Sequence, residues 1–247
     1  DLMKWPDGSI RSLMTGLEVS YQNDAEAIQY INKDWLDQLN LEVPTTVDEL
    51  YDVLCAFRDN DMNGNGDKTD EIPMELAESN WAGQVLNMSN PWGIAAWNSD
   101  PLNCYYKLQD GKVLPTANSQ EYRDYLEYMH KLVADGLLDK ECFTETNDQY
   151  YAKIKSGRVG FFSGWVPQSL LSNEEAAKWV PVRVLKAEDS ITPVKTGMRN
   201  KLFANRTGFV ITANCENPER LLQWWDYLSS STEMKYTVRF GEKGGYW

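Results

Sequence analysis

The order of apolar and polar residues along the 247-residue chain predicts several amphipathic helices. The clearest pattern follows Thr46, where apolar side chains recur every three or four positions as far as Phe57. Thr46 and Glu49 form a capping box that begins this helix. A second helix is predicted over residues 119–134, ending before Gly136. Its inward face is predicted to carry Tyr122, Tyr125, Leu126, Met129, Leu132 and Val133.

Three further segments have weaker helical patterns. One begins at Asn23 or Asp24 and continues to Asn40, and its apolar face is predicted to hold Ile28, Ile31, Trp35, Leu36 and Leu39. A short helix is predicted over residues 148–154. The last begins after Asn217, because Pro218 suits the first helical position. Its inward residues are predicted to be Leu221, Leu222, Trp225 and Leu228.

Strand patterns occur between these helices. Residues 17–21 alternate apolar with polar, residues 157–162 form a turn followed by a buried strand, and residues 208–212 form a stronger strand than residues 180–185. Residues 186–200 are polar with little periodicity and are predicted to be a loop or linker. Helices alternating with strands predict the α/β fold class.

Composition excludes several classes of protein. The chain has 24 basic and 37 acidic residues, a formal charge of −13, so nucleic acid is not expected as a partner. The mean hydropathy is −0.54, and the charge-free stretch at residues 79–99 contains too many amides to cross a bilayer. His130 is the single histidine, which excludes sites that need two imidazole ligands within this chain.

One loop carries oxygen donors in a calcium-binding pattern. After the helix that begins at Thr46, residues 59–71 alternate Asp or Asn with Gly. Counting Asp61 as position one places Gly66 at position six, as in the first half of an EF-hand loop, but position twelve is Ile72 rather than Glu. A register that begins at Asp59 is also compatible, as is a solvated Asn/Gly turn. The expected ligands of a structural Ca²⁺ ion are Asp61, Asn63, Asn65, Asp67, Asp70 and Glu71.

Tryptophan is the second chemical signal. The chain has 10 Trp residues, and 12% of all residues are aromatic. Trp165 follows the predicted buried strand, and Trp81, Trp92 and Trp97 lie in the charge-free stretch. An indole face can stack on a sugar ring while nearby amides and carboxylates bind the hydroxyl groups. These four residues are the predicted ligand-binding residues, and the alternative is that they fill the core beneath a loop.

Several motifs, in order, resemble the family 1 extracellular solute-binding proteins of ABC importers. Residues 32–36 read N-K-D-W-L, and residues 41–50 fit L-x-x-P-T-T-x-D-E-L. Residues 61–66 with 70–73 resemble the calcium loop of the oligosaccharide-binding branch, with one extra residue before Asp70. Further matches lie at residues 110–113, 136–139, 157–165, 217–219 and 241–247.

The resemblance implies a periplasmic-binding-protein-like (type II) fold with ligand held between two lobes. Residues 1–22 would be a hinge strand and remnant of the first lobe, residues 23–207 the second lobe, and residues 208–247 a crossing back toward the first lobe. Trp165 matches the sugar-stacking position of maltodextrin-binding relatives, and Trp81 matches a second cleft aromatic.

The implied function is capture of a solute, with carbohydrate or oligosaccharide as the expected class, for ABC permease subunits without catalysis. The expected protein is an extracellular monomer, anchored as a lipoprotein by a segment outside this chain. Two alternatives from other classes are a glycoside hydrolase, which would use paired carboxylates, and a calcium-stabilised adhesion or scaffold module.

Overall fold

The computed structural model describes residues 4–15, 28–94, 106–109, 112–194 and 205–244. The chain divides into two compact units, of which unit 1 comprises residues 1–20 and 200–247 and unit 2 comprises residues 21–199. The boundaries expected from sequence were 22/23 and 207/208. No helix within the described ranges combines the length and apolarity that a membrane span requires.

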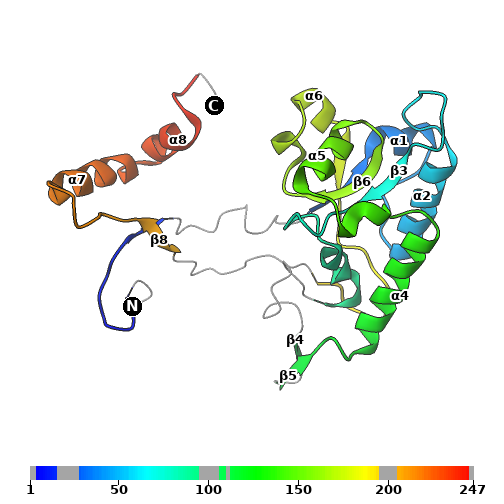
Figure 1. Cartoon of the computed structure of the whole chain (residues 1–247), viewed down its shortest axis with the longest axis horizontal. Coiled ribbons are helices and arrows are strands. Elements are labelled where there is room, and N and C mark those ends of the chain that lie inside the picture. Colours follow the sequence, from blue (N-terminus) through cyan, green and yellow to red (C-terminus); the bar gives the residue numbers. More distant parts are fainter. Residues whose placement is uncertain (1–3, 16–27, 95–105, 110–111, 195–204, 245–247) are drawn as a thin grey trace. The chain divides into compact units, whose positions relative to one another are not determined.

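Unit 2 is built on a four-stranded mixed sheet in the order β3-β6-β2-β7 (Figure 1). Its strands are β3 (Ile72–Glu75), β6 (Val159–Gly164), β2 (Ile28–Asn32) and β7 (Trp179–Val182). β3 runs parallel to β6, whereas β2 is antiparallel to both β6 and β7. A separate hairpin pairs β4 (Tyr106–Gln109) with β5 (Lys112–Pro115).

Helices cover both faces of this sheet. In sequence order they are α1 (Lys33–Gln38), α2 (Val47–Asp59), α4 (Gln120–Ala134), α5 (Asn147–Lys155) and α6 (Asn173–Ala176), with 3-10 turns η2 (Val85–Trp92), η3 (Lys140–Phe143) and η4 (Pro167–Ser169). Ile31 and Phe161 pack with α2 and α4 in the larger core. Their neighbours Tyr30 and Phe162 belong to a second core with α5, because successive side chains of a strand face opposite ways.

Glycine is required where the sheet meets the larger core. A Cβ atom on Gly160 would lie 2.5 Å from the ring of Phe57 and 2.9 Å from that of Trp35. β6 can therefore approach α2 closely only because residue 160 has no side chain.

Unit 1 contains the antiparallel pair β1 (Leu13–Thr15) and β8 (Asn205–Phe209), followed by α7 (Pro218–Ser229) and α8 (Thr232–Phe240). Phe209 stacks on Trp225 with ring centroids 4.6 Å apart. This contact fixes α7 against the strand that precedes it.

The local sequence signals are confirmed where capping decides the structure. Thr46 and Glu49 form the predicted capping box of α2, Ser119 caps α4, and Asn217 caps α7. The α/β fold class is likewise confirmed by the mixed sheet and its covering helices.

The predicted helix over residues 23–40 is wrong. Residues 28–32 form β2 in the middle of the sheet, and only α1 is helical in the described part of that segment. A strand buried on both faces has few polar positions, so its apolar residues imitate a helical repeat. The predicted strand at residues 17–21 lies outside the described residues.

Two residues that were predicted to face inward are exposed instead. Leu126 of α4 and Leu222 of α7 are 48% and 42% exposed. The strand predicted over residues 208–212 is found earlier in the chain, as β8 (Asn205–Phe209), because its pairing with β1 ends at Phe209.

Candidate functional site

Trp165 lies directly after the carboxyl end of β6. The strand is buried along its whole length up to Gly164, and the next residue, Trp165, is 42% exposed. Its carbonyl oxygen accepts a 2.8 Å hydrogen bond from the Tyr30 hydroxyl. Burial raises the pKa of Tyr30 to about 12, so this hydroxyl remains a donor at neutral pH. The backbone is thus held while the indole faces outward.

Trp81 lies in a tight loop after β3. Asn80 Oδ1 accepts hydrogen bonds from the backbone N–H groups of Ala82 (3.0 Å) and Gly83 (3.1 Å), which forms an Asx-type turn. Asn80 Nδ2 donates to Asn147 Oδ1 (2.9 Å) and to the Tyr151 hydroxyl (2.8 Å) on α5. The indole of Trp81 remains 39% exposed on this fixed loop.

The structure brings these two predicted site residues together. The rings of Trp81 and Trp165 lie 6.5 Å apart with an interplanar angle of 63°. Ser163 Oγ donates a 2.6 Å hydrogen bond to the Ala82 carbonyl, which ties β6 to the Trp81 loop. Both indoles follow the carboxyl ends of parallel strands, the edge where open α/β sheets bind ligands.

Trp92 is not available for ligand stacking. It is 6% exposed and packs in the larger core against Tyr125 and Tyr128, with centroids 5.6 and 5.3 Å away. The side-chain amides of Asn87 and Asn90, close to Trp92 in the sequence, are buried and hydrogen-bonded to backbone carbonyls. Trp97 lies outside the described residues.

The predicted calcium loop is closed by its own carboxylates. Asp61 Oδ1 accepts the N–H groups of Gly64 (2.7 Å) and Asn65 (3.2 Å), and its Oδ2 accepts that of Gly66 (2.8 Å). Asp59, the start of the alternative register, instead forms an ion pair with Arg58 at 2.8 Å. Asp61 thus closes the loop through backbone hydrogen bonds, whereas Asp59 is paired with Arg58.

The remaining predicted ligands form three separate sets of contacts. Asn63 Nδ2 and Asn65 Nδ2 donate to the two oxygens of Asp70 at 3.1 and 2.9 Å. Glu71 Oε1 accepts the N–H of Met62 at 2.8 Å, and its Oε2 is buried without a hydrogen-bond partner. Asp67 Oδ1 accepts from the Thr69 N–H and hydroxyl, and at position seven of the loop the carbonyl of Asp67 is the expected ligand.

The orphaned Glu71 oxygen fits a cation within this loop. Rotation of the Asn63 and Asn65 amides would turn oxygens rather than nitrogens toward Asp70. Among the described residues, no three carboxylate, thiolate or imidazole side chains converge closely enough to hold an ion. A calcium site here would thus depend on amide and carbonyl oxygens as well.

Sequence reasoning missed an ionic network that joins β3 to α5. Lys153 Nζ lies 2.8 Å from Asp139, 2.9 Å from Glu141, 2.6 Å from Glu145 and 3.7 Å from Glu75. Burial by itself lowers the pKa of Lys153, but its hydrogen bonds to Asp139, Glu145 and Glu141 outweigh that effect and raise the pKa above its usual value. This lysine stays charged.

Two carboxyl groups of the network are almost fully buried. The side chains of Glu75 and Glu145 are 0% and 1% exposed, and apart from the charge of Lys153 their four oxygens have no hydrogen-bond partner among the described residues. Burial, with the adjacent Glu145 adding to it, raises the pKa of Glu75 to about 10. Glu75 is thus a neutral acid at pH 7, and its proton can be donated to Glu145.

Exposed paired indoles at the carboxyl edge of an α/β sheet are features of a ligand-capturing lobe, and comparison with known families gives the same class. The chain belongs to the bacterial extracellular solute-binding protein family, whose model matches residues 10–235. This family consists of binding proteins rather than enzymes, so the glycoside hydrolase alternative is set aside.

Individual relatives agree with this class. The fructooligosaccharide ABC transporter substrate-binding protein FusA of Streptococcus pneumoniae serotype 4 is 34% identical over 232 residues, which cover 91% of this chain and 41% of that protein. The FusA structure in complex with kestose has a TM-score of 0.72 at 31% identity and covers 92% of this chain and 45% of that one. A FusA EF-hand mutant with fructo-nystose has a TM-score of 0.75 at 29% identity, covering 98% and 48%. This chain therefore spans less than half of these relatives.

Proposed function

We propose that this chain is part of the oligosaccharide-capturing subunit of an ABC importer and that it binds without catalysis. The observation that carries the proposal is the pair of exposed indoles, Trp81 and Trp165, fixed at the carboxyl edge of the sheet. Two indoles inclined to one another can contact successive sugar units, and buried hydrogen bonds hold both backbones in place before ligand arrives.

The ligand class proposed for this site is a neutral oligosaccharide such as a fructooligosaccharide. FusA, whose name gives that ligand, is the relative that supports the choice. We further propose that the protein acts outside the cell as a monomer, anchored as a lipoprotein by a segment beyond this chain, and delivers its ligand to ABC permease subunits. The family description and the relative named lipoprotein LipO of Bacillus subtilis, 32% identical over 135 residues, support this location.

We also propose a structural Ca²⁺ ion in the loop at residues 61–71. The side chains of Asp61, Asn63, Asn65, Asp70 and Glu71 and the carbonyl of Asp67 would hold it. The ion would balance the clustered carboxylates and fix the connection between α2 and β3. The assignment is supported by FusA, which has an EF-hand that was altered in one of its solved structures.

Replacing Trp165 by Ala is expected to weaken oligosaccharide binding about 10- to 100-fold, because a stacked indole face worth about 1.5–3 kcal/mol is lost. Tryptophan fluorescence of the chain, titrated with kestose beside a reducing-sugar assay, measures this effect. Trp179→Phe is the matched control, since Trp179 lies at the opposite end of the sheet. Saturable quenching without product supports the proposal. Released product, or equal affinity in Trp165→Ala and the parent, would contradict it.

A further inference from the structure

A second concave site lies at the opposite edge of the unit 2 sheet. Its cavity of about 510 Å³ is lined by residues that precede β3 and β6, among them Asn63, Ser156 and Arg158. The exposed indoles instead follow those two parallel strands. A strand rises about 3.3 Å per residue, so β6 alone separates the two sites by about 20 Å. A ligand in this cavity would not reach the Trp81–Trp165 pair.

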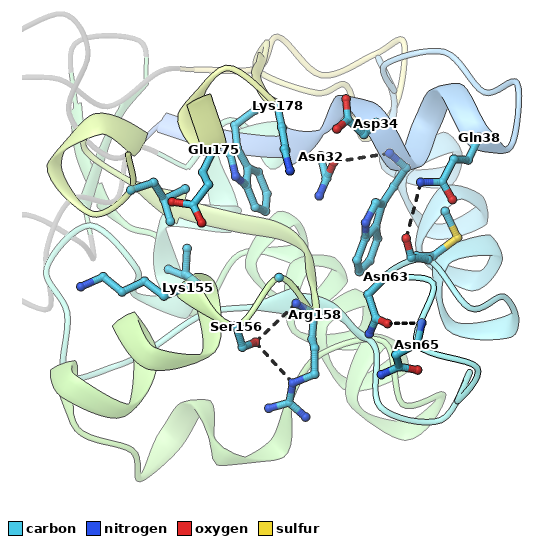
Figure 2. A pocket seen from close by; sticks show the side chains of 16 residues that line it. Asn32, Asp34, Gln38, Asn63, Asn65, Lys155, Ser156, Arg158, Glu175 and Lys178 are labelled. Carbon is cyan, nitrogen blue, oxygen red and sulfur yellow. Dashed lines mark hydrogen bonds between the residues drawn. The ribbon is translucent and has the colours of Figure 1, made fainter. Parts of the chain in front are cut away.

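Asn32 directs a hydrogen-bond donor into this cavity. Its side chain is the N-cap of α1, and Oδ1 accepts the Trp35 N–H at 3.4 Å. That bond fixes the amide so that Nδ2 faces the open space, as Figure 2 shows. Asn32 is 7% exposed, and no described residue accepts a hydrogen bond from Nδ2. Nδ2 is accessible from the cavity, so a ligand that brings an acceptor can bond to it.

Positive charge lies beside this amide. The ammonium of Lys178 projects toward the same space, whereas the guanidinium of Arg158 points down and away from it and Lys155 turns outward at the rim (Figure 2). Neither Lys178 nor Arg158 forms an ion pair within 4.0 Å with a described residue. Glu175 lines the same cavity, and its carboxylate accepts hydrogen bonds from the Ser172 N–H and hydroxyl at 3.2 and 2.8 Å in the α6 capping box. These bonds, with the charge of Lys178 adding to them, lower the pKa of Glu175.

The rest of the lining mixes polar and apolar side chains, and it includes the carboxylate of Asp34. Trp179 is half-buried, packs edge-on against Phe162 at 4.6 Å and borders the cavity. Gln38 and Ser156 add groups able to bind hydroxyls. The volume is within the usual range for small-molecule sites of about 300–1,000 Å³.

We propose that this cavity binds a small hydroxylated carboxylate of the size of a sugar acid. Asn32 Nδ2 and Lys178 hold the carboxylate, Trp179 packs against the C–H face of the ring, and the neighbouring polar side chains bind its hydroxyls. The site is distinct from the oligosaccharide site of the proposed function and needs no contribution from unit 1.

Sodium glucuronate is the probe, and glucose is its neutral match. Titration of the ¹⁵N-labelled 247-residue chain should give saturable shifts of one indole N–H signal, assigned to Trp179 with Trp179→Phe. Glucose should bind at least tenfold more weakly, and glucuronate affinity should fall between about 50 and 500 mM NaCl, because salt screens the charges. Glucose affinity equal to that of glucuronate would overturn the assignment.

Two variants test the donors. Asn32→Asp keeps the cap of α1 but places a carboxylate against the ligand, and Lys178→Gln removes one charge; each is expected to weaken glucuronate binding about tenfold or more. Arg123→Gln, an exposed cation on α4, should change nothing. Parent-like affinity in both cavity variants, or inorganic phosphate binding as tightly as glucuronate, would refute the proposal. Kestose should bind Lys178→Gln as it binds the parent, so failure of this site is distinguishable from failure of the oligosaccharide site.

Discussion

Replacing Glu75 by Gln is expected to stabilise unit 2 at pH 8 by about 2–4 kcal/mol and to raise its melting temperature by about 5–10 °C. The parent must hold a proton on Glu75 to keep a carboxyl group 0% exposed beside Glu145. Glutamine has the same shape, needs no proton and offers an N–H donor to Glu145. Urea unfolding followed by circular dichroism measures the difference.

Glu75 also determines how the stability of the folded chain is expected to depend on pH. The pKa of Glu75 is about 10 in the folded chain and near 4.5 in the unfolded chain, so the folded state binds the additional proton between these values. Stability should therefore fall as pH rises from about 5 to 8, by at most about 1.4 kcal/mol per pH unit. Carboxylates with lowered pKa, such as Glu49 and Asp67, act in the opposite direction but only below about pH 5.

Glu141→Gln is the matched control for this prediction. Glu141 also lies near Lys153, at 2.9 Å, but its side chain is 69% exposed. Its removal should therefore leave the dependence of stability on pH unchanged. A Glu75→Gln variant that is less stable than the parent at pH 8, or that retains the parent's slope, would show that Glu75 is ionised in the folded chain.

Removal of calcium is expected to lower the melting temperature by about 5–10 °C, and addition of Ca²⁺ to restore it. An ion at a hundred times its dissociation constant stabilises the folded state by about 2.7 kcal/mol, and each kcal/mol shifts the melting temperature of a chain of this size by about 2–4 °C. Calorimetry with EDTA and then with excess CaCl₂ measures the effect. Mg²⁺ should substitute poorly because it demands a smaller octahedral site.

Neighbouring acids provide the controls for the calcium prediction. Asp61→Asn and Glu71→Gln should abolish the response to Ca²⁺, because Asp61 closes the loop and Glu71 has the orphaned oxygen. Asp59→Asn should retain it, since Asp59 is paired with Arg58 outside the loop. A response lost in Asp59→Asn but kept in Asp61→Asn would establish the other register, and an EDTA-insensitive parent would show that no ion stabilises this loop.

The proposed oligosaccharide site could be predicted only in part from sequence. Trp165 could be located because an apolar strand signal ends directly before it, and this signal is local. Its partnership with Trp81 depends on β3 and β6 being neighbours in the sheet, which no local pattern contains. Asn80 could have been noticed as a turn-forming residue before Trp81, but its hydrogen bonds to α5 could not.

By itself, the sequence determined the class of fold, the capped helices α2, α4 and α7, the Asp/Asn/Gly loop and the family, because these depend on residues a few positions apart or on their order. Only the tertiary structure decided that residues 28–32 form the central strand β2, that Trp92 is buried, and that Glu75, Glu145 and Lys153 meet. Each of these depends on which distant segments pack together, and burial and pKa follow from that packing rather than from neighbours along the chain.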